Sequence, residues 1–151
     1  MSQPLYIKNE VTIDASPSTV WDALVNPAQT KQYMFGCETV SDWQPGSSLE
    51  WVGEHEGKSM VFVKGSIVEI DPGHFLAYTT IDPHSNIDDT SENYLTVTYT
   101  LEPRDGQTHF TVTQGDYAKV AEGERRYNDS WNNGVGWQPI LDQIKQLVES
   151  K

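Results

Sequence analysis

The chain has 151 residues, and 22 acidic against 10 basic side chains give it a formal net charge of −12 at pH 7. Its lysines and arginines are scattered, so they form no basic face that would neutralise phosphates, and we expect neither nucleic acid nor an anionic membrane surface as a partner. No apolar run approaches the roughly 20 residues that span a bilayer, and the N-terminal segment MSQPLYIKNE lacks the apolar core of a signal peptide. We expect one cytoplasmic domain over residues 1–151.

The only cysteine, Cys37, excludes an intrachain disulfide and is consistent with a reducing compartment. No specific activating neighbour stands beside it in the sequence. We therefore interpret it as a small, partly buried apolar residue rather than a reactive thiol.

The N-terminal part predicts a strand followed by two helices. Residues 5–13 alternate apolar and polar side chains, which is typical of a strand. Ser16 can cap a helix, and Pro17 suits the first helical position, where no N–H bond is needed. Asn26-Pro27 ends this helix, and a second short helix is expected over residues 27–33.

From residue 37 to residue 115, short runs rich in Val, Ile, Thr and aromatic residues alternate with turn signals such as Asp71-Pro72-Gly73. Most connections are too short for the crossover helices that parallel pairing requires, so the sheet should be antiparallel. The expected strands are Cys37–Ser41, Ser48–Glu54, Ser59–Ile70, His74–Ile81, Asn93–Glu102 and Thr108–Asp116.

The C-terminal segment is apolar at steps of three or four from Trp131 to Val148, which predicts a helix. Pro139 lies inside this pattern and cannot donate a backbone hydrogen bond, so the helix either bends there or begins there. We favour one kinked helix, and a break between Asn132 and Pro139 is the alternative. Gly134 and Gly136 have two interpretations. Either the helix approaches the sheet closely at these residues, or they lie in a loop and the helix begins after them.

Helices therefore lie at the two ends of the chain and strands fill the middle, which defines an α+β fold. We expect a curved antiparallel sheet of six or seven strands wrapped around a long C-terminal helix, with two short helices after the first strand. Because one helix covers only the middle of a curled sheet, inward side chains either pack on it or line a cavity.

The opening VTIDASP, leading to VWDAL at residues 20–24, resembles the start of the START-like (SRPBCC, helix-grip) superfamily. Within it, the chain is most similar to the family of the C-terminal domain of the activator of Hsp90 ATPase. The later block GSIVEIDP at residues 65–72 and the ending with Gly136-Trp137 and Ile140-Leu141 are similar to the same family. The resemblance spans nearly the whole chain, and its motifs are mainly structural.

This resemblance implies the helix-grip fold, a cavity between sheet and helix, and a chaperone as one possible partner. The full co-chaperone carries a further N-terminal domain that contacts Hsp90, and 151 residues leave no room for it. Two residues depart from the family: Thr80 stands where an aromatic residue is usual, and a proline is rare at the position of Pro139. Both positions bear on the shape of the cavity.

Alternation places Val97 and Tyr99 on the inner face of their strand and the neighbouring threonines on the outer face. Inward-facing side chains of this kind either pack in the core or line a ligand site. With the resemblance taken into account, we give the two interpretations equal weight. The candidate ligand-binding residues are Trp51, Met60, Phe62, Tyr78, Val97, Tyr99, Phe110, Val112, Gln114, Trp131, Val135 and Gln138.

Affinity in such a cavity needs polar anchors. A ligand that buries about 300 Å² of apolar surface gains roughly 7 kcal/mol, and association costs at least about 4 kcal/mol. The remainder corresponds to millimolar binding. Four of the candidates carry a hydrogen-bonding group on an inward position: Tyr78, Tyr99, Gln114 and Gln138.

No cofactor motif, metal site or catalytic group is assigned. The acidic segment 82–92 spaces its polar residues like a calcium loop, but Ile87 and Asn93 stand where that loop needs glycine and a bidentate glutamate. His55 has no second His or Cys at ligand spacing. No nucleophile elbow or phosphate loop is present, and none of the four histidines has a visible orienting partner.

The leading hypothesis is a non-catalytic carrier or sensor that binds an apolar or amphipathic small molecule between sheet and helix. A cyclase- or hydrolase-type enzyme in the same cavity is the first alternative, and it requires a buried acid or histidine facing the cavity. A protein-interaction module for an Hsp90-related chaperone is the second. Nothing in the sequence indicates the oligomeric state.

Overall fold

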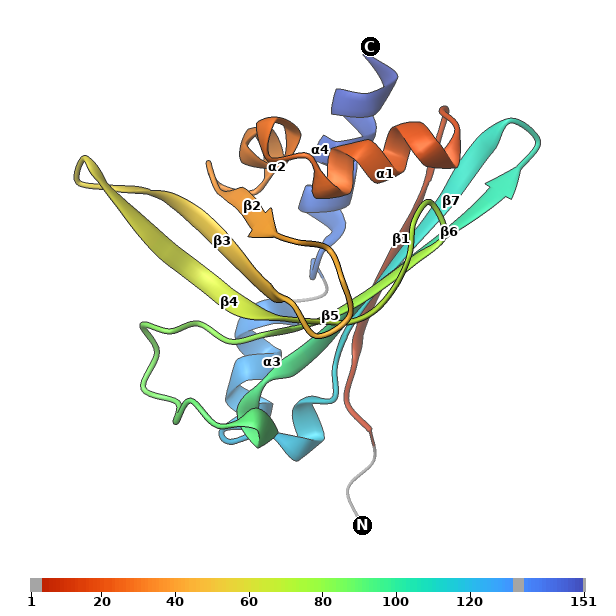
Figure 1. Cartoon of the computed structure of the whole chain (residues 1–151). Helices are drawn as coiled ribbons and strands as arrows, with labels where there is room; N and C mark the ends of the chain where they lie inside the picture. Colours follow the sequence, from red (N-terminus) through yellow and green to blue (C-terminus); the bar gives the residue numbers. More distant parts are fainter. Residues whose placement is uncertain (1–3, 132–134, 151) are drawn as a thin grey trace.

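The computed structural model describes residues 4–131 and 135–150, in which seven strands form one antiparallel sheet that curls around the C-terminal helix (Figure 1). The strands are β1 (Ile7–Ile13), β2 (Glu38–Ser41), β3 (Ser48–His55), β4 (Lys58–Asp71), β5 (Phe75–Thr80), β6 (Leu95–Arg104) and β7 (Gln107–Gly115). Their spatial order is β1-β7-β6-β5-β4-β3-β2. The expected helix-grip fold is confirmed, and the expected strands match these to within two residues at each end.

The helices in the described part of the chain lie at its two ends. They are α1 (Pro17–Val25), α2 (Pro27–Tyr33), α3 (Gly123–Trp131) and α4 (Gln138–Glu149). As the sequence predicts, Ser16 caps α1, with its hydroxyl accepting from the Thr19 N–H at 3.4 Å. Two single-turn 3₁₀ helices, Ser91–Asn93 and Tyr117–Lys119, complete the structure.

The C-terminal helix differs from the favoured expectation of one kinked helix. Residues 135–137 form a turn with Gly136 at φ +53°, and α4 begins only at Gln138. Pro139 therefore lies in the first turn, where its missing N–H leaves no hydrogen bond unmade. The interpretation of Pro139 as a kink inside a longer helix is wrong, and Gly134 and Asn132 lie outside the described residues.

The core lies between the concave face of the sheet and the helices α1, α2 and α4. From α4, Leu141, Ile144 and Val148 are buried at helical spacing against it. On β6, Val97 and Tyr99 are buried while the neighbouring threonines are half-exposed, which confirms the predicted alternation.

A second, smaller cluster joins β1 and β6 to α3. Ile7, Leu95 and Tyr117 form its buried centre, and Tyr127 and Trp131 from α3 pack against them. The rings of Tyr127 and Trp131 stack, with centroids 6.2 Å apart. This cluster holds α3 beside the open end of the sheet, away from α1 and α2 (Figure 1).

Strand β4 bends the sheet, because it pairs with β3 along its first part and with β5 along its last part. At the bend, Gly65 lies against the backbone of Thr79, and a Cβ atom on Gly65 would be 1.6 Å from the Thr79 carbonyl oxygen. Only glycine permits this approach. Beyond the bend, β3 and the first part of β4 extend away from α4 (Figure 1).

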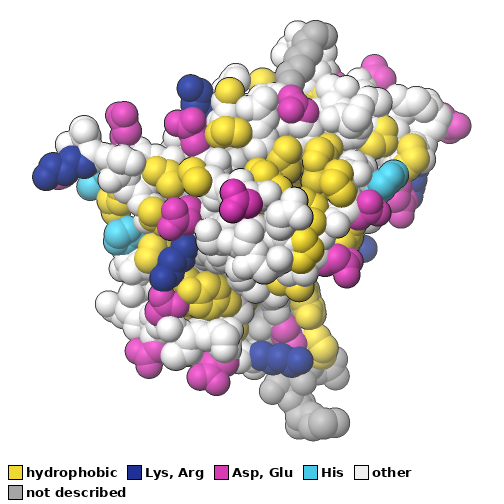
Figure 2. All heavy atoms as spheres, in the orientation of Figure 1, with side chains coloured by type: hydrophobic (Ala, Val, Ile, Leu, Met, Phe, Trp, Pro, Cys, Tyr) yellow, Lys and Arg dark blue, Asp and Glu magenta, His cyan; other side chains and the backbone are white. Residues whose placement is uncertain are grey.

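The face of the molecule in Figure 2 carries many acidic side chains, and its basic side chains lie singly among them. Hydrophobic side chains form small groups between these charges. Among the described residues, no helix has the length and apolar character needed to cross a membrane.

Candidate functional site

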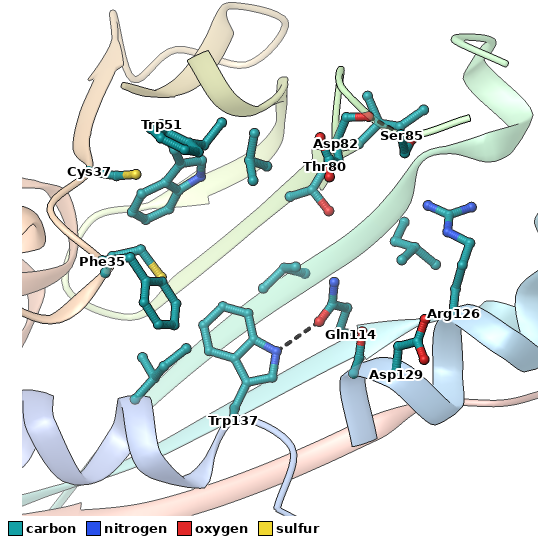
Figure 3. A pocket seen from close by; sticks show the side chains of 18 of the residues that line it. Phe35, Cys37, Trp51, Thr80, Asp82, Ser85, Gln114, Arg126, Asp129 and Trp137 are labelled. Atoms are coloured by element: carbon teal, nitrogen blue, oxygen red, sulfur yellow. Dashed lines mark hydrogen bonds between the residues drawn. The ribbon is translucent and has the colours of Figure 1, made fainter. Parts of the chain in front are cut away.

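A pocket of about 690 Å³ lies between the helices α3 and α4 and the bent part of the sheet. Its volume falls within the range of small-molecule sites, about 300–1,000 Å³. Figure 3 shows two ends of different character, with Phe35, Cys37 and Trp51 at one and Asp82, Arg126 and Asp129 at the other. The site is therefore apolar at one end and polar at the other.

The segment after α2 forms the apolar end. Cys37 is 4% exposed, and burial raises the pKa of its thiol, so the side chain contributes a neutral apolar surface as expected. Trp51 from β3 and Phe62 from β4 continue this wall. Phe35, at φ +54°, is 86% exposed and lines the rim.

Trp137, in the turn before α4, forms the wall between the two ends. Its backbone N–H donates to Asn9 Oδ1 and its indole N–H donates to Gln114 Oε1, both at 2.8 Å (Figure 3). Its ring meets that of Tyr99 edge to face, with centroids 6.2 Å apart. Contacts from β1, β6 and β7 therefore fix the position of this indole.

Tyr78 on β5 lines the pocket with its ring while its hydroxyl is hydrogen-bonded inside the core. The Tyr78 and Tyr99 hydroxyl oxygens are 2.7 Å apart, and both side chains are at most 2% exposed. Burial raises the pKa of both phenols, so both remain protonated at neutral pH. Since each hydroxyl has the other as its hydrogen-bond partner inside the core, neither is placed to anchor a ligand.

The polar end is formed by α3 and by the segment that follows β5. Thr80 ends β5 at the pocket wall. Asp82 and Ser85 line the pocket from the following loop. Arg126 and Asp129 reach it from α3 (Figure 3).

The loop 82–90 is attached to β4 and to the start of β6. The His84 ring lies 2.8 Å from the Val61 carbonyl oxygen, and Asp89 forms an ion pair with Lys64. Asp89 also accepts a hydrogen bond from the Tyr94 hydroxyl at 2.6 Å, and together these contacts hold the pKa of its carboxyl low. In the part of the chain that the structure describes, no group of three His, Cys, Asp or Glu side chains is arranged to hold a metal ion.

Five of the twelve candidate ligand-binding residues line the pocket: Trp51, Phe62, Tyr78, Val97 and Gln114. They come from β3, β4, β5, β6 and β7, so the curved sheet brings together side chains that are up to 63 positions apart in the sequence. Gln114 is the candidate polar anchor that reaches the pocket interior, where Figure 3 shows its amide nitrogen on the pocket side.

The other seven candidates lie elsewhere. Tyr99, Phe110 and Val112 face inward as expected but are buried in the main core. Met60 lies near the tip of the β3–β4 hairpin, and Trp131 packs in the smaller cluster. The last two lie in and just after the turn that precedes α4: Val135 is exposed, and Gln138, the first residue of α4, donates its amide N–H to Asp142 on the surface.

Sequence reasoning missed most of the lining, which comes from loops, from α3 and from single positions of β4, β5, β6 and α4. These residues are Met34, Phe35, Cys37, Val63, Thr80, Ile81, Asp82, Ser85, Ile87, Leu95, Arg125, Arg126, Asp129, Ser130, Gly136, Trp137 and Ile140. Helix α3 has a mostly polar sequence, so it lacks the broad apolar face that marks a packed helix. The pair Tyr127 and Trp131, four residues apart, is the one apolar signal that would have indicated it.

The curled antiparallel sheet, the C-terminal helix laid across it and the pocket between them define a START-like helix-grip protein. The family model described as "Activator of Hsp90 ATPase homolog 1-like protein" matches residues 14–149. The chain belongs to this family.

Solved structures agree with that assignment. ChR145 from Cytophaga hutchinsonii is 33% identical over 99% of this chain and 97% of its own, with a TM-score of 0.73. The Aha1 dimer from Colwellia psychrerythraea is 16% identical over 96% of each chain, with a TM-score of 0.66. PFC0360w from Plasmodium falciparum, described as an HSP90 activator, is 14% identical with the same coverage and TM-score. A search of curated proteins finds no significant match.

Proposed function

We propose that this protein binds an apolar or amphipathic small molecule in the pocket between α4 and the sheet, without transforming it. The observation that carries the proposal is the volume of about 690 Å³ bordered by Trp51, Phe62 and Trp137. A pocket of this size lined by aromatic side chains with a few polar groups is the usual form of a small-molecule site.

The lining favours binding over the cyclase or hydrolase alternative. Acid–base catalysis in a cavity of this kind needs a carboxylic acid or imidazole held inside it, with a pKa tuned by burial. Among the described lining residues there is no histidine, and the two carboxylates, Asp82 and Asp129, are exposed at the rim. Tyr78 lines the pocket with its ring, and its buried hydroxyl bonds to Tyr99.

Contact with an Hsp90-type chaperone remains a prediction that rests on the family alone. The solved neighbour described as an HSP90 activator is 14% identical to this chain. Similarity at that level shows a shared fold and does not show a shared partner. Small-molecule binding has more direct support than chaperone binding, because the pocket is a feature of this chain's own structure.

The proposal is tested with N-phenyl-1-naphthylamine, a neutral aromatic probe whose fluorescence rises in apolar surroundings. A probe that buries about 400 Å² gains about 10 kcal/mol, and association costs at least about 4 kcal/mol. We therefore expect saturable, one-to-one binding with a dissociation constant of about 40 µM or weaker. Probe fluorescence should rise while tryptophan emission falls, because Trp51 and Trp137 line the pocket. A linear, unsaturable signal up to millimolar probe would contradict the proposal.

A further inference from the structure

The polar end of the pocket contains a cationic side chain that forms no ion pair within the described part of the chain. Arg126 extends from α3 to this end (Figure 3), and none of the ion pairs formed among the described residues includes it. Its Nη1 donates to the carbonyl oxygens of Asn93 at 3.1 Å and Ala121 at 3.3 Å. Backbone groups thus hold the guanidinium in place, and no carboxylate of the described residues forms an ion pair with it.

The adjacent arginine shows the contrast. Arg125 donates to Glu122 at 2.8 Å and to Asp129 at 3.3 Å, and its side chain is 55% exposed. Arg126, by comparison, is half-buried, and burial lowers the pKa of its guanidinium. In a chain with a net charge of −12, a half-buried arginine that is left unpaired stands out.

The acidic side chains near Arg126 already have other partners. Asp129 and Glu122 are bonded to Arg125, and the Asp82 carboxylate accepts from the His84 N–H at 2.8 Å. A guanidinium carries five N–H donors in a planar fork that matches the oxygens of a carboxylate, sulfonate or phosphate. One nitrogen of Arg126 is taken by the two carbonyls, and no described residue accepts from the rest of the fork, which can therefore meet an anion.

We propose that the ligand is an amphipathic anion, whose acidic group pairs with Arg126 while its apolar body lies toward Trp51 and Phe62. This inference rests on the proposed function and specifies the chemical class of its ligand. The two ends of the pocket match the two ends of such a molecule (Figure 3). The Gln114 amide lies between the two ends as a further donor.

Two probes that differ by one anionic group test the inference. 1-Anilinonaphthalene-8-sulfonate has the skeleton of N-phenyl-1-naphthylamine with an added sulfonate. In Arg126→Gln we expect the affinity for the sulfonate probe to fall about tenfold, while the affinity for the neutral probe stays within about twofold. Tenfold corresponds to about 1.4 kcal/mol, which is reasonable for one partly exposed charged contact.

Two matched variants complete the experiment. Arg104→Gln removes an arginine charge that lies outside the pocket and is paired with Glu102, so it should change neither affinity, whereas Arg126→Lys should retain most of the preference for the sulfonate. Near-ultraviolet circular dichroism checks that each variant keeps its packing, since loosely packed states bind the sulfonate probe non-specifically.

The outcomes separate the two proposals. If the neutral probe binds and Arg126→Gln weakens both probes equally or neither, the anionic ligand class is overturned and the pocket proposal stands. If neither probe binds the wild-type protein, both proposals fail. Equal losses in Arg104→Gln and Arg126→Gln would indicate a general effect of net charge and would also overturn the inference.

Discussion

Gly65→Ala should lower the free energy of unfolding by about 3 kcal/mol, the largest effect that we expect from a single methyl group in this chain. The added Cβ would lie 1.6 Å from the Thr79 carbonyl oxygen and 2.4 Å from its carbonyl carbon. Both are backbone atoms of the neighbouring strand, so no side-chain rotation relieves the clash. β4 and β5 must separate, which weakens the bridge between Lys64 and Ile81.

Thermal unfolding followed by circular dichroism measures this effect, and for a chain of this length about 3 kcal/mol lowers Tm by roughly 10 °C. Gly57→Ala is the matched control: Gly57 has φ +79° and no atom within 4 Å of the added Cβ, so the change should cost only about 1 kcal/mol. Equal Tm values for Gly65→Ala and the wild type would contradict the close approach of β4 to β5. Because Thr80 and Ile81 follow the clash site and line the pocket, probe binding should weaken as well.

Tyr78→Phe and Tyr99→Phe should each destabilise the protein by about 2 kcal/mol, and the double variant should cost less than the sum of the two. Each single change removes one hydroxyl of a pair 2.7 Å apart and leaves the other buried without its partner. In the double variant both polar groups are gone, and two phenylalanines fill the same space. The penalty for an unsatisfied hydroxyl therefore disappears.

Urea unfolding of the four proteins in this cycle gives the coupling energy, which we expect to be about 1–2 kcal/mol. Tyr33→Phe provides a comparison, because the Tyr33 hydroxyl donates to the Ala23 carbonyl oxygen at 2.8 Å rather than to another phenol. It should show no coupling of that size to Tyr78→Phe. Strict additivity of Tyr78→Phe and Tyr99→Phe would mean that their hydroxyls do not satisfy one another.

The strands could be predicted closely because two local signals coincide. Inward and outward residues alternate along β6 and β7, and turn residues such as those at Asp71-Pro72-Gly73 separate successive runs. The C-terminal region was harder because Pro139 fits both a kink inside a helix and the first turn of one. The turn at residues 135–137, bonded to β1 and β7 through Trp137, decides between them, and that tertiary contact is invisible in the sequence.

The pocket lining could be predicted only in part, because alternation shows which side chains face inward and not where packing leaves space. Tyr99 and Phe110 face inward, yet their rings meet edge to face with centroids 5.4 Å apart and are covered. The remaining space lies toward Trp51 and Trp137, beyond these covered rings. Arg126 reaches it from a polar helix that has no broad apolar periodicity.

The central claim is that an apolar molecule enters the space between α4 and the bent sheet, and the indole signals of a ¹⁵N-labelled sample test it directly. Of the five tryptophans, Trp51 and Trp137 line the pocket, whereas Trp21 and Trp43 pack against the core outside it. On titration with N-phenyl-1-naphthylamine, we predict saturable shifts of the Trp51 and Trp137 indole N–H resonances, with those of Trp21 and Trp43 unchanged. Unchanged Trp51 and Trp137 signals at saturating probe, or equal shifts of all four, would contradict the account.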